Sequence, residues 1–145
     1  MVRFMTWNPW RHLRDHHPHI HVTYPNGDTG CLGRWTADGI RINGHSTQRE
    51  RRCTLAHEIV HVERGPAPSE LHYALREEQV VDEIASRRLI ELDRLIDVLA
   101  WNRYRVDDET AEELWVDLAT LQSRVRNLTS DERELIDEEL ERRQP

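Results

Sequence analysis

Short apolar runs alternate with turn residues in the first third of the chain. The runs HIHVTY, CLGRWT and IRIN lie between Pro18 and Gly44, and the segments PNGDTG and ADG separate them. Valine, isoleucine, threonine and tryptophan favour extended backbone, whereas pairs such as Asn-Gly and Asp-Gly reverse the chain. The pattern predicts three short antiparallel strands.

A helical pattern follows these strands. Thr47 and Glu50 have the spacing of a capping box, in which the two side chains close the first turn of a helix. Apolar residues then recur at helical spacing, at Leu55, Ile59 and Val62. Gly65 ends the pattern, so a helix is predicted over about residues 48–64.

The rest of the chain is also predicted to be helical. A second start signal lies at Ser69, and apolar residues recur at helical spacing as far as Ile96, with a break near Glu91. From Asp107 onward the pattern predicts two or three shorter helices, the last of them highly charged. We therefore expect an α+β fold, with a first domain over residues 1–106 and a helical C-terminal region over residues 107–145.

Length and composition limit the class of protein. A chain of 145 residues can bury one core of ordinary size. No apolar run approaches the roughly 18 residues that a membrane span needs, and the N-terminus lacks the apolar segment of a secretory signal. We expect a cytoplasmic protein that contacts no membrane, with Cys31 and Cys53 both reduced.

Residues 57–61 read HEIVH, an H-E-x-x-H pattern in the middle of the first long helix. Residues four apart lie on the same face of a helix, so His57 and His61 can reach one metal ion. Glu58 lies beside that face, where it can take a proton from water at the metal without binding the metal itself. The alternative is a surface helix with two solvated histidines, but the capped helix and its apolar stripe favour a metal site.

Two carboxylates of the second long helix can complete this site. The face expected to be buried is marked by Leu71, Leu75, Ala85 and Leu89. Glu78 and Asp82 lie within about 20° of the middle of that face. Because a bare carboxylate in a core is costly, a cation on the neighbouring helix is expected to face them. Glu78 is the predicted third ligand, and Asp82 is predicted to accept the outer N–H of a ligating histidine.

The neighbouring carboxylates are expected to have other roles. Glu77 and Glu83 lie about 120° from the middle of the buried face, so solvent should cover them. For the two central carboxylates, the alternative to a metal is an ion pair with Arg51 or Arg52.

The segments ERRCTLAHEIVHVERG and REEQVVDEIASRRLI carry a family resemblance. They resemble the ImmA/IrrE-type metallopeptidases, whose hallmark is a helix reading roughly R-F-T-L-A-H-E-x-x-H, followed by a helix with a ligand glutamate and an Asn or Asp four residues later. The matching positions are Arg52, Thr54, Leu55, Ala56, His57, Glu58, His61, Glu78, Asp82, Ala85 and Leu89. The resemblance covers residues 39–92. It departs from the pattern at Cys53, where an aromatic residue is usual, and at Asp82, where Asn is commoner.

The resemblance implies a zinc peptidase of phages, mobile elements or their hosts that cleaves or inactivates a partner repressor. Residues 1–106 would then be a zincin-like metallopeptidase domain that binds zinc through His57, His61 and Glu78, with Glu58 as general base. We also expect one strand to be an edge that pairs with extended substrate. That strand consists of Ile40, Arg41, Ile42 and Asn43.

Five histidines crowd the N-terminus: His12, His16, His17, His19 and His21. Strand alternation puts only the last two on one face, and the local sequence offers no carboxylate or cysteine at ligand spacing. Surface or packing roles are therefore expected.

Residues 111–128 resemble a helix-turn-helix, although Trp115 occupies the position where a turn glycine is customary. Residues 107–145 carry thirteen acidic and five basic side chains, a net charge of −8. Because proteins bind duplexes largely by neutralising phosphates, we expect a protein partner for this region and not DNA. The competing function is that of a non-catalytic, zinc-stabilised regulator that binds protein or DNA.

Overall fold

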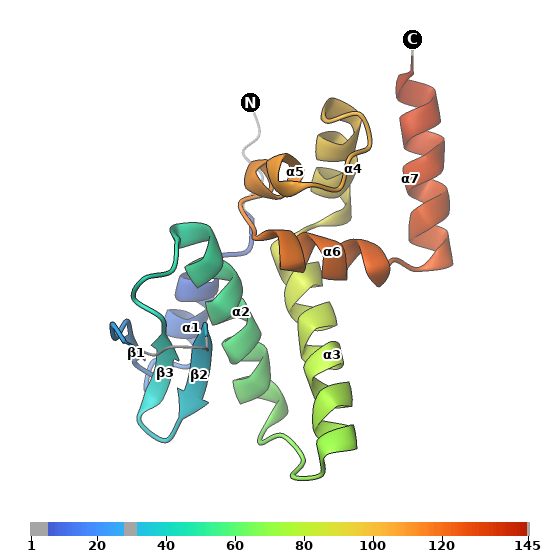
Figure 1. The fold of residues 1–145 in the computed structure, drawn as a ribbon. Helices are drawn as coiled ribbons and strands as arrows, with labels where there is room; N and C mark the ends of the chain where they lie inside the picture. The colour runs from blue at the N-terminus through green and yellow to red at the C-terminus, as the bar shows by residue number, and fades with distance from the viewer. Residues whose placement is uncertain (1–5, 28–31, 145) are drawn as a thin grey trace.

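The computed structural model describes residues 6–27 and 32–144, and in these stretches the chain forms seven helices and three strands (Figure 1). The elements in chain order are α1 (Pro9–His16), β1 (Val22–Thr23), β2 (Gly33–Thr36), β3 (Gly39–Ile42), α2 (Gln48–Arg64), α3 (Leu71–Leu89), α4 (Leu92–Trp101), α5 (Asp108–Glu113), α6 (Leu118–Arg126) and α7 (Ser130–Arg143). The predicted α+β class is confirmed. None of the helices in these stretches is long and apolar enough to cross a membrane.

The small sheet is mixed, so the prediction of three antiparallel strands is wrong in part. The strand order is β1-β3-β2; β2 and β3 are antiparallel around the turn at Ala37 and Asp38, whereas β1 runs parallel to β3. The chain does reverse at each step, but the third strand inserts between the first two. One of its two neighbours must therefore run parallel to it.

The insertion of β3 also corrects the expected substrate edge. Residues Ile40, Arg41 and Ile42 belong to the central strand, which β1 and β2 flank on both sides, and Asn43 donates its backbone N–H to Leu32 O. These residues cannot form a free edge. The outer strands of the described sheet are β1 and β2.

The predicted boundaries of the first long helix are confirmed, whereas α3 begins at Leu71 with Glu70, and not Ser69, as its N-cap. Thr47 and Glu50 make both hydrogen bonds of the capping box at the start of α2. The helix ends at Arg64 because Gly65 adopts a φ of 93°, a left-handed conformation that favours glycine. The break near Glu91 separates α3 from α4, and three shorter helices follow Asp107, of which α7 is the most charged.

Two apolar clusters hold the elements together. The smaller cluster joins α1, the sheet and α2 through Leu13, Ile40, Ile42, Leu55 and Ile59. The larger one lies where α2 and α3 meet the C-terminal helices, and it extends from Cys53 to Ile136. The helices after residue 107 therefore share a core with α2 and α3, and the domain boundary at residue 106 stays a prediction.

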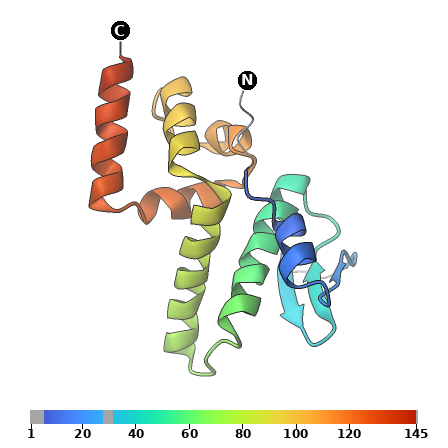
Figure 2. The same ribbon diagram turned by 180° about the vertical axis from the view of Figure 1, so that it is seen from behind.

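Seen from behind, α1 lies against α2 beside the sheet, while α7 stands along α4 at the other end of the molecule (Figure 2). Cys53 is a free, buried thiol among the described residues. Cys31 lies outside the described residues.

Candidate metal centre

Three side chains from α2 and α3 converge on one point. His57 Nε2 lies 3.0 Å from Glu78 Oε2, and His61 Nε2 lies 2.8 Å from Glu78 Oε1. The two imidazole Nε2 atoms are 3.1 Å apart. The structure thus brings together the three residues that helix spacing selected, while their role as ligands stays a prediction.

The hairpin of α2 and α3 places these side chains opposite one another. One helical turn separates the two histidines on α2, and α3 returns antiparallel beside it (Figure 1). Arg64 donates two hydrogen bonds, of 2.6 and 2.8 Å, to Glu77 near the loop of the hairpin. The expectation that solvent covers Glu77 is therefore wrong, because this pairing leaves only 16% of its side chain exposed.

Asp82 lies beside His57 on the side of the ring away from the convergence point. Its Oδ1 is 2.9 Å from His57 Nδ1. Burial lowers the pKa of His57, but the hydrogen bond to Asp82 and the negative charges of Glu58, Asp82 and Glu78 outweigh burial, so the pKa lies above its usual value. A carboxylate at Nδ1 holds a proton there and leaves the Nε2 lone pair facing Glu78.

The prediction that the two carboxylates lie in a buried apolar stripe is wrong. The side chains of Glu78 and Asp82 are 46% and 50% exposed. Leu71 and Leu75, which were expected to bury the first turns of α3, are also exposed. The buried face of α3 begins only at Val81, because the first part of the helix extends beyond the larger cluster.

The two arginines of the alternative explanation bind elsewhere. Arg51 donates to Gly44 O at 2.9 Å, and its guanidinium lies over the ring of Tyr24. Arg52 donates to Trp115 O at 2.8 Å. An ion pair with these arginines therefore does not account for the placement of the two carboxylates.

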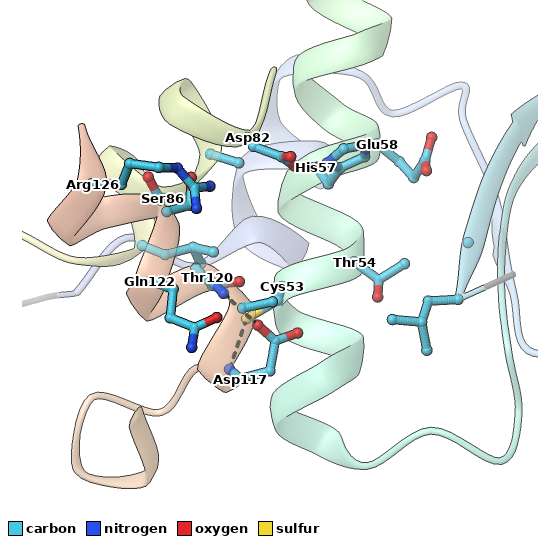
Figure 3. A pocket seen from close by; sticks show the side chains of 16 residues that line it. Cys53, Thr54, His57, Glu58, Asp82, Ser86, Asp117, Thr120, Gln122 and Arg126 are labelled. Carbon is cyan, nitrogen blue, oxygen red and sulfur yellow. Dashed lines mark hydrogen bonds and ion pairs between the residues drawn. The ribbon is translucent and has the colours of Figure 1, made fainter. Parts of the chain in front are cut away.

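Glu58 projects from a different side of α2, toward the strands (Figure 3). It is only 7% exposed, and it accepts a hydrogen bond from the backbone of Trp35 in β2. Burial raises the pKa of Glu58, and the charge of Glu78 adds to this effect, which exceeds the opposing influence of His57 and His61. The carboxylate is thus held in a fixed position beside the two histidines.

The close approach of β2 to Glu58 was missed in the sequence analysis. A Cβ atom at Gly33 would collide with the side chain of Thr54, one turn before Glu58 on α2. A glycine inside a β-rich run indicates close approach of another part of the molecule, so the LGRW segment carried a usable signal.

Two hollows open beside the convergence point. One, of about 460 Å³, lies between α2, α3 and α6, and Figure 3 shows side chains that line it, among them Cys53, Asp82, Thr120 and Arg126. The other, of about 930 Å³, is lined by β2 and by His57, Glu58, His61 and Glu78. The candidate centre is therefore accessible from the side of the sheet.

The donor set fits a divalent metal ion of the zinc class. Imidazole nitrogens and a carboxylate oxygen are common zinc ligands, and tetrahedral bonds of about 2.0–2.1 Å place ligand atoms about 3.3 Å apart. The observed separations of 2.8, 3.0 and 3.1 Å are close to that value. All three ligand atoms can therefore face one ion with small adjustments.

Comparison with known proteins gives one match. The model of the peptidase M78 family, described as the IrrE N-terminal-like domain, matches residues 12–126. No curated protein and no solved structure matches the chain.

Proposed function

The chain belongs to the M78 peptidase family of IrrE N-terminal-like domains, and we propose that it is a zinc-dependent endopeptidase that cleaves a regulatory protein. The observation that carries this proposal is the convergence of His57, His61 and Glu78 next to the buried Glu58. Two imidazoles and one carboxylate supply three ligands and leave room for water and substrate, as in catalytic zinc sites.

The side chains of the centre have different roles in binding the metal ion. His57, His61 and Glu78 would hold the ion, and Asp82 would fix the orientation of the His57 ring through Nδ1. When bound, the zinc ion supplies Lewis-acid chemistry, which polarises a peptide carbonyl and makes water more acidic at neutral pH.

Glu58 is proposed as the general base. Its carboxylate would take a proton from the attacking water and then pass it to the leaving amine. The hydrogen bond from the Trp35 backbone holds the carboxylate in place. Proton transfer of this kind contributes roughly 10² to 10⁴-fold to a rate.

The outer side of β2 is the proposed binding site for extended substrate. In the antiparallel pairing of β2 with β3, Trp35 lies opposite Ile40, whose N–H donates to His21 O on the other side of β3. This pair therefore shares no hydrogen bond, and the Trp35 N–H points away from β3 and toward Glu58. A peptide laid along β2 would cross the 930 Å³ hollow and bring a carbonyl to the centre. The family resemblance supports a transcriptional repressor of a phage or mobile element as the substrate.

Metal content tests the ligand set. Purified protein should hold zinc at this centre, and Glu78→Ala should lose it, whereas Glu83→Ala should not. Glu83 is the better control, because its side chain lies on the same helix and has only a 3.6 Å contact with Arg87, while Glu77 is tied to Arg64. Zinc retained by Glu78→Ala at this centre would contradict the proposed set.

Comparison of cells that express wild type or Glu58→Gln tests the reaction. New protein N-termini should appear with wild type and be absent with Glu58→Gln, whose zinc content and folded state should be unchanged. If wild type produced no N-termini beyond those of cells that lack the protein, this would contradict peptidase activity and favour the zinc-stabilised regulator. Cleavage of the identified substrate by both purified proteins at one rate would show that Glu58 is not the base.

A further inference from the structure

A second group of potential metal ligands lies between α1 and the end of α2. His12 Nε2 is 2.9 Å from Glu63 Oε2, and His17 Nε2 is 3.6 Å from the same oxygen. The three ligand atoms all lie within 4.8 Å of one another. We infer that His12, His17 and Glu63 form a second binding site for a divalent transition-metal ion of the zinc class.

Tertiary packing assembles this site from distant parts of the sequence. His12 lies on α1, His17 follows the last residue of α1, and Glu63 lies in the last turn of α2, 51 residues after His12. The sequence analysis found no carboxylate at ligand spacing near the histidines, which is why packing roles were expected for them. The contact of α1 with α2 supplies the missing carboxylate.

The nitrogen of His17 provides an independent indication of a ligand. His17 Nε2 is buried, and it makes no hydrogen bond in the part of the chain that the structure describes. A buried nitrogen of this kind has lost its bonds to water without a replacement. His17 Nε2 lies 3.6 Å from Glu63 Oε2, so a metal ion bound by both atoms would supply the missing partner.

The carboxylate of Glu63 is oriented for such an ion. Arg88 Nη1 donates to Glu63 Oε1 at 2.6 Å, so one oxygen is occupied and the other faces the two imidazoles. The side chains of His12, His17 and Glu63 are 17%, 21% and 25% exposed. The site is therefore partly covered, and it is open enough for an ion and a water ligand to enter.

The ring of His12 must change its proton position when the ion binds. Trp7 Nε1 can only donate, so its 3.4 Å bond makes His12 Nδ1 an acceptor and leaves the ring proton on Nε2, facing Glu63. The metal would take the place of that proton, and the proton would move to Nδ1. Two hydrogen bonds are lost in this exchange, the long one from Trp7 and the 2.9 Å one from His12 Nε2 to Glu63, and the bonds of the metal to both ligand atoms replace the second.

The second site is separate from the candidate catalytic centre. Glu63 follows His61 by two residues, a rotation of about 200° on a helix, so the two side chains leave α2 in nearly opposite directions. An ion held by Glu63 would join α1 to α2, and it would stabilise this contact without any ligand from α3.

Zinc titration of the metal-free, tag-free chain tests the inference. By equilibrium dialysis and elemental analysis, wild type should bind about two zinc ions, Glu78→Ala one, and Glu78→Ala with His17→Ala none. Loss of a ligand should lower the affinity by more than the roughly 100-fold that loss of a group supporting a ligand can cost. His19→Ala is the matched control in the Glu78→Ala background, because His19 is exposed and should leave one zinc bound.

Thermal unfolding gives a second readout. Zinc at 100 times its dissociation constant should raise the ratio of folded to unfolded Glu78→Ala protein about 100-fold, with a matching rise in Tm. Adding His17→Ala or the isosteric Glu63→Gln should remove this rise, so the test does not depend on one variant. Glu78→Ala protein that binds no zinc, or zinc binding unchanged by both further substitutions, would overturn the inference.

Discussion

The hairpin of α2 and α3 uses charged side chains differently at its middle and at the end where it meets the C-terminal helices. In the middle, His57, His61 and Glu78 face one another and Glu78 is half-exposed. At the far end, Arg52 is only 7% exposed, and its best hydrogen bond goes to Trp115 O at 2.8 Å, with longer ones to Trp7, Leu89 and Leu114.

The two arrangements differ in what they leave open. The histidines and the glutamate direct lone pairs to a shared point that a cation can occupy, whereas the guanidinium of Arg52 is surrounded by backbone carbonyls. Two of these carbonyls belong to Leu89 and Leu114, at the C-terminal ends of α3 and α5, where the helix dipoles favour a positive charge. Burial lowers the pKa of Arg52, but a guanidinium stays charged at neutral pH. The first region is built to bind, the second to hold elements together.

Replacement of Arg52 should give the largest loss of stability. Arg52→Met keeps much of the side-chain volume but leaves buried carbonyls without a donor, so we expect a loss of about 3 kcal/mol in the free energy of unfolding. Glu78→Gln should cost less than about 1 kcal/mol in metal-free protein, because the side chain is half-hydrated. Urea unfolding in the presence of a chelator measures both.

Arg14→Ala is the control for loss of an arginine. Its side chain is 71% exposed, so a change within about 0.5 kcal/mol is expected. If Arg52→Met and Glu78→Gln both unfolded at the same urea concentration as wild type, Arg52 would not contribute more to stability than Glu78. The contrast between the two regions of the hairpin would then be wrong.

The ion pair that joins Arg87 of α3 to Glu132 of α7 should contribute to stability in a way that depends on pH. Arg87 donates two hydrogen bonds to Glu132, and together with the Thr129 backbone and Arg124 it lowers the pKa of Glu132 from 4.5 to about 2. Because the folded pKa is depressed, the stabilisation is complete above about pH 4.5 and is lost as the pH falls toward 2. At pH 7, Glu132→Gln should cost about 2 kcal/mol, less than the full linkage value because the side chain is partly hydrated.

The pH dependence separates this effect from a simple loss of packing. The difference in unfolding free energy between wild type and Glu132→Gln should shrink between about pH 4.5 and pH 2. Asp131→Asn, an exposed neighbour in the same helical turn, is the control, and it should change the free energy of unfolding at pH 7 by less than about 0.5 kcal/mol. A constant difference across this range would mean that the charge of Glu132 contributes nothing.

Helix periodicity was sufficient to select the members of the candidate centre, because spacing on α2 and α3 determines which side chains share a direction. It did not predict their exposure. Leu71 and Leu75 have the phase of a buried face, yet burial depends on whether another element covers that part of α3. The same limit applies to β3. Its alternation of apolar and polar residues resembles that of an edge strand, but β1 pairs with its outer side and makes it the central strand.

The buried arginine contacts and the second histidine cluster could not be predicted from the sequence for a different reason. Arg52 binds carbonyls, which every residue carries, so no sequence pattern marks its partners 37 to 63 residues away. Glu63 joins His12 across 51 residues through the contact of α1 with α2. Local spacing identifies ligands on one helix, but it cannot identify those that tertiary packing brings together.

The interactions that hold the helices together also determine which arginine of α6 is available to bind DNA. Arg124 is only 3% exposed; it donates to Ile90 O at 2.9 Å and to Glu132 at 3.1 Å. It is therefore unavailable to a phosphate, and its replacement would lower stability. Arg126, which is exposed, is the appropriate position for a test of DNA binding.

The smallest expected effect is that of Arg126→Ala on duplex binding. Residues 107–145 carry a net charge of −8, and Arg126 is the one exposed basic side chain on the described α6, so we expect weak binding that does not depend on DNA sequence. Titration of labelled random and operator-like duplexes at low salt should give affinities for wild type and Arg126→Ala that agree within about twofold, since one phosphate contact at most is lost. Tight binding to one duplex sequence that Arg126→Ala weakens at least tenfold would instead make α6 a DNA-reading helix.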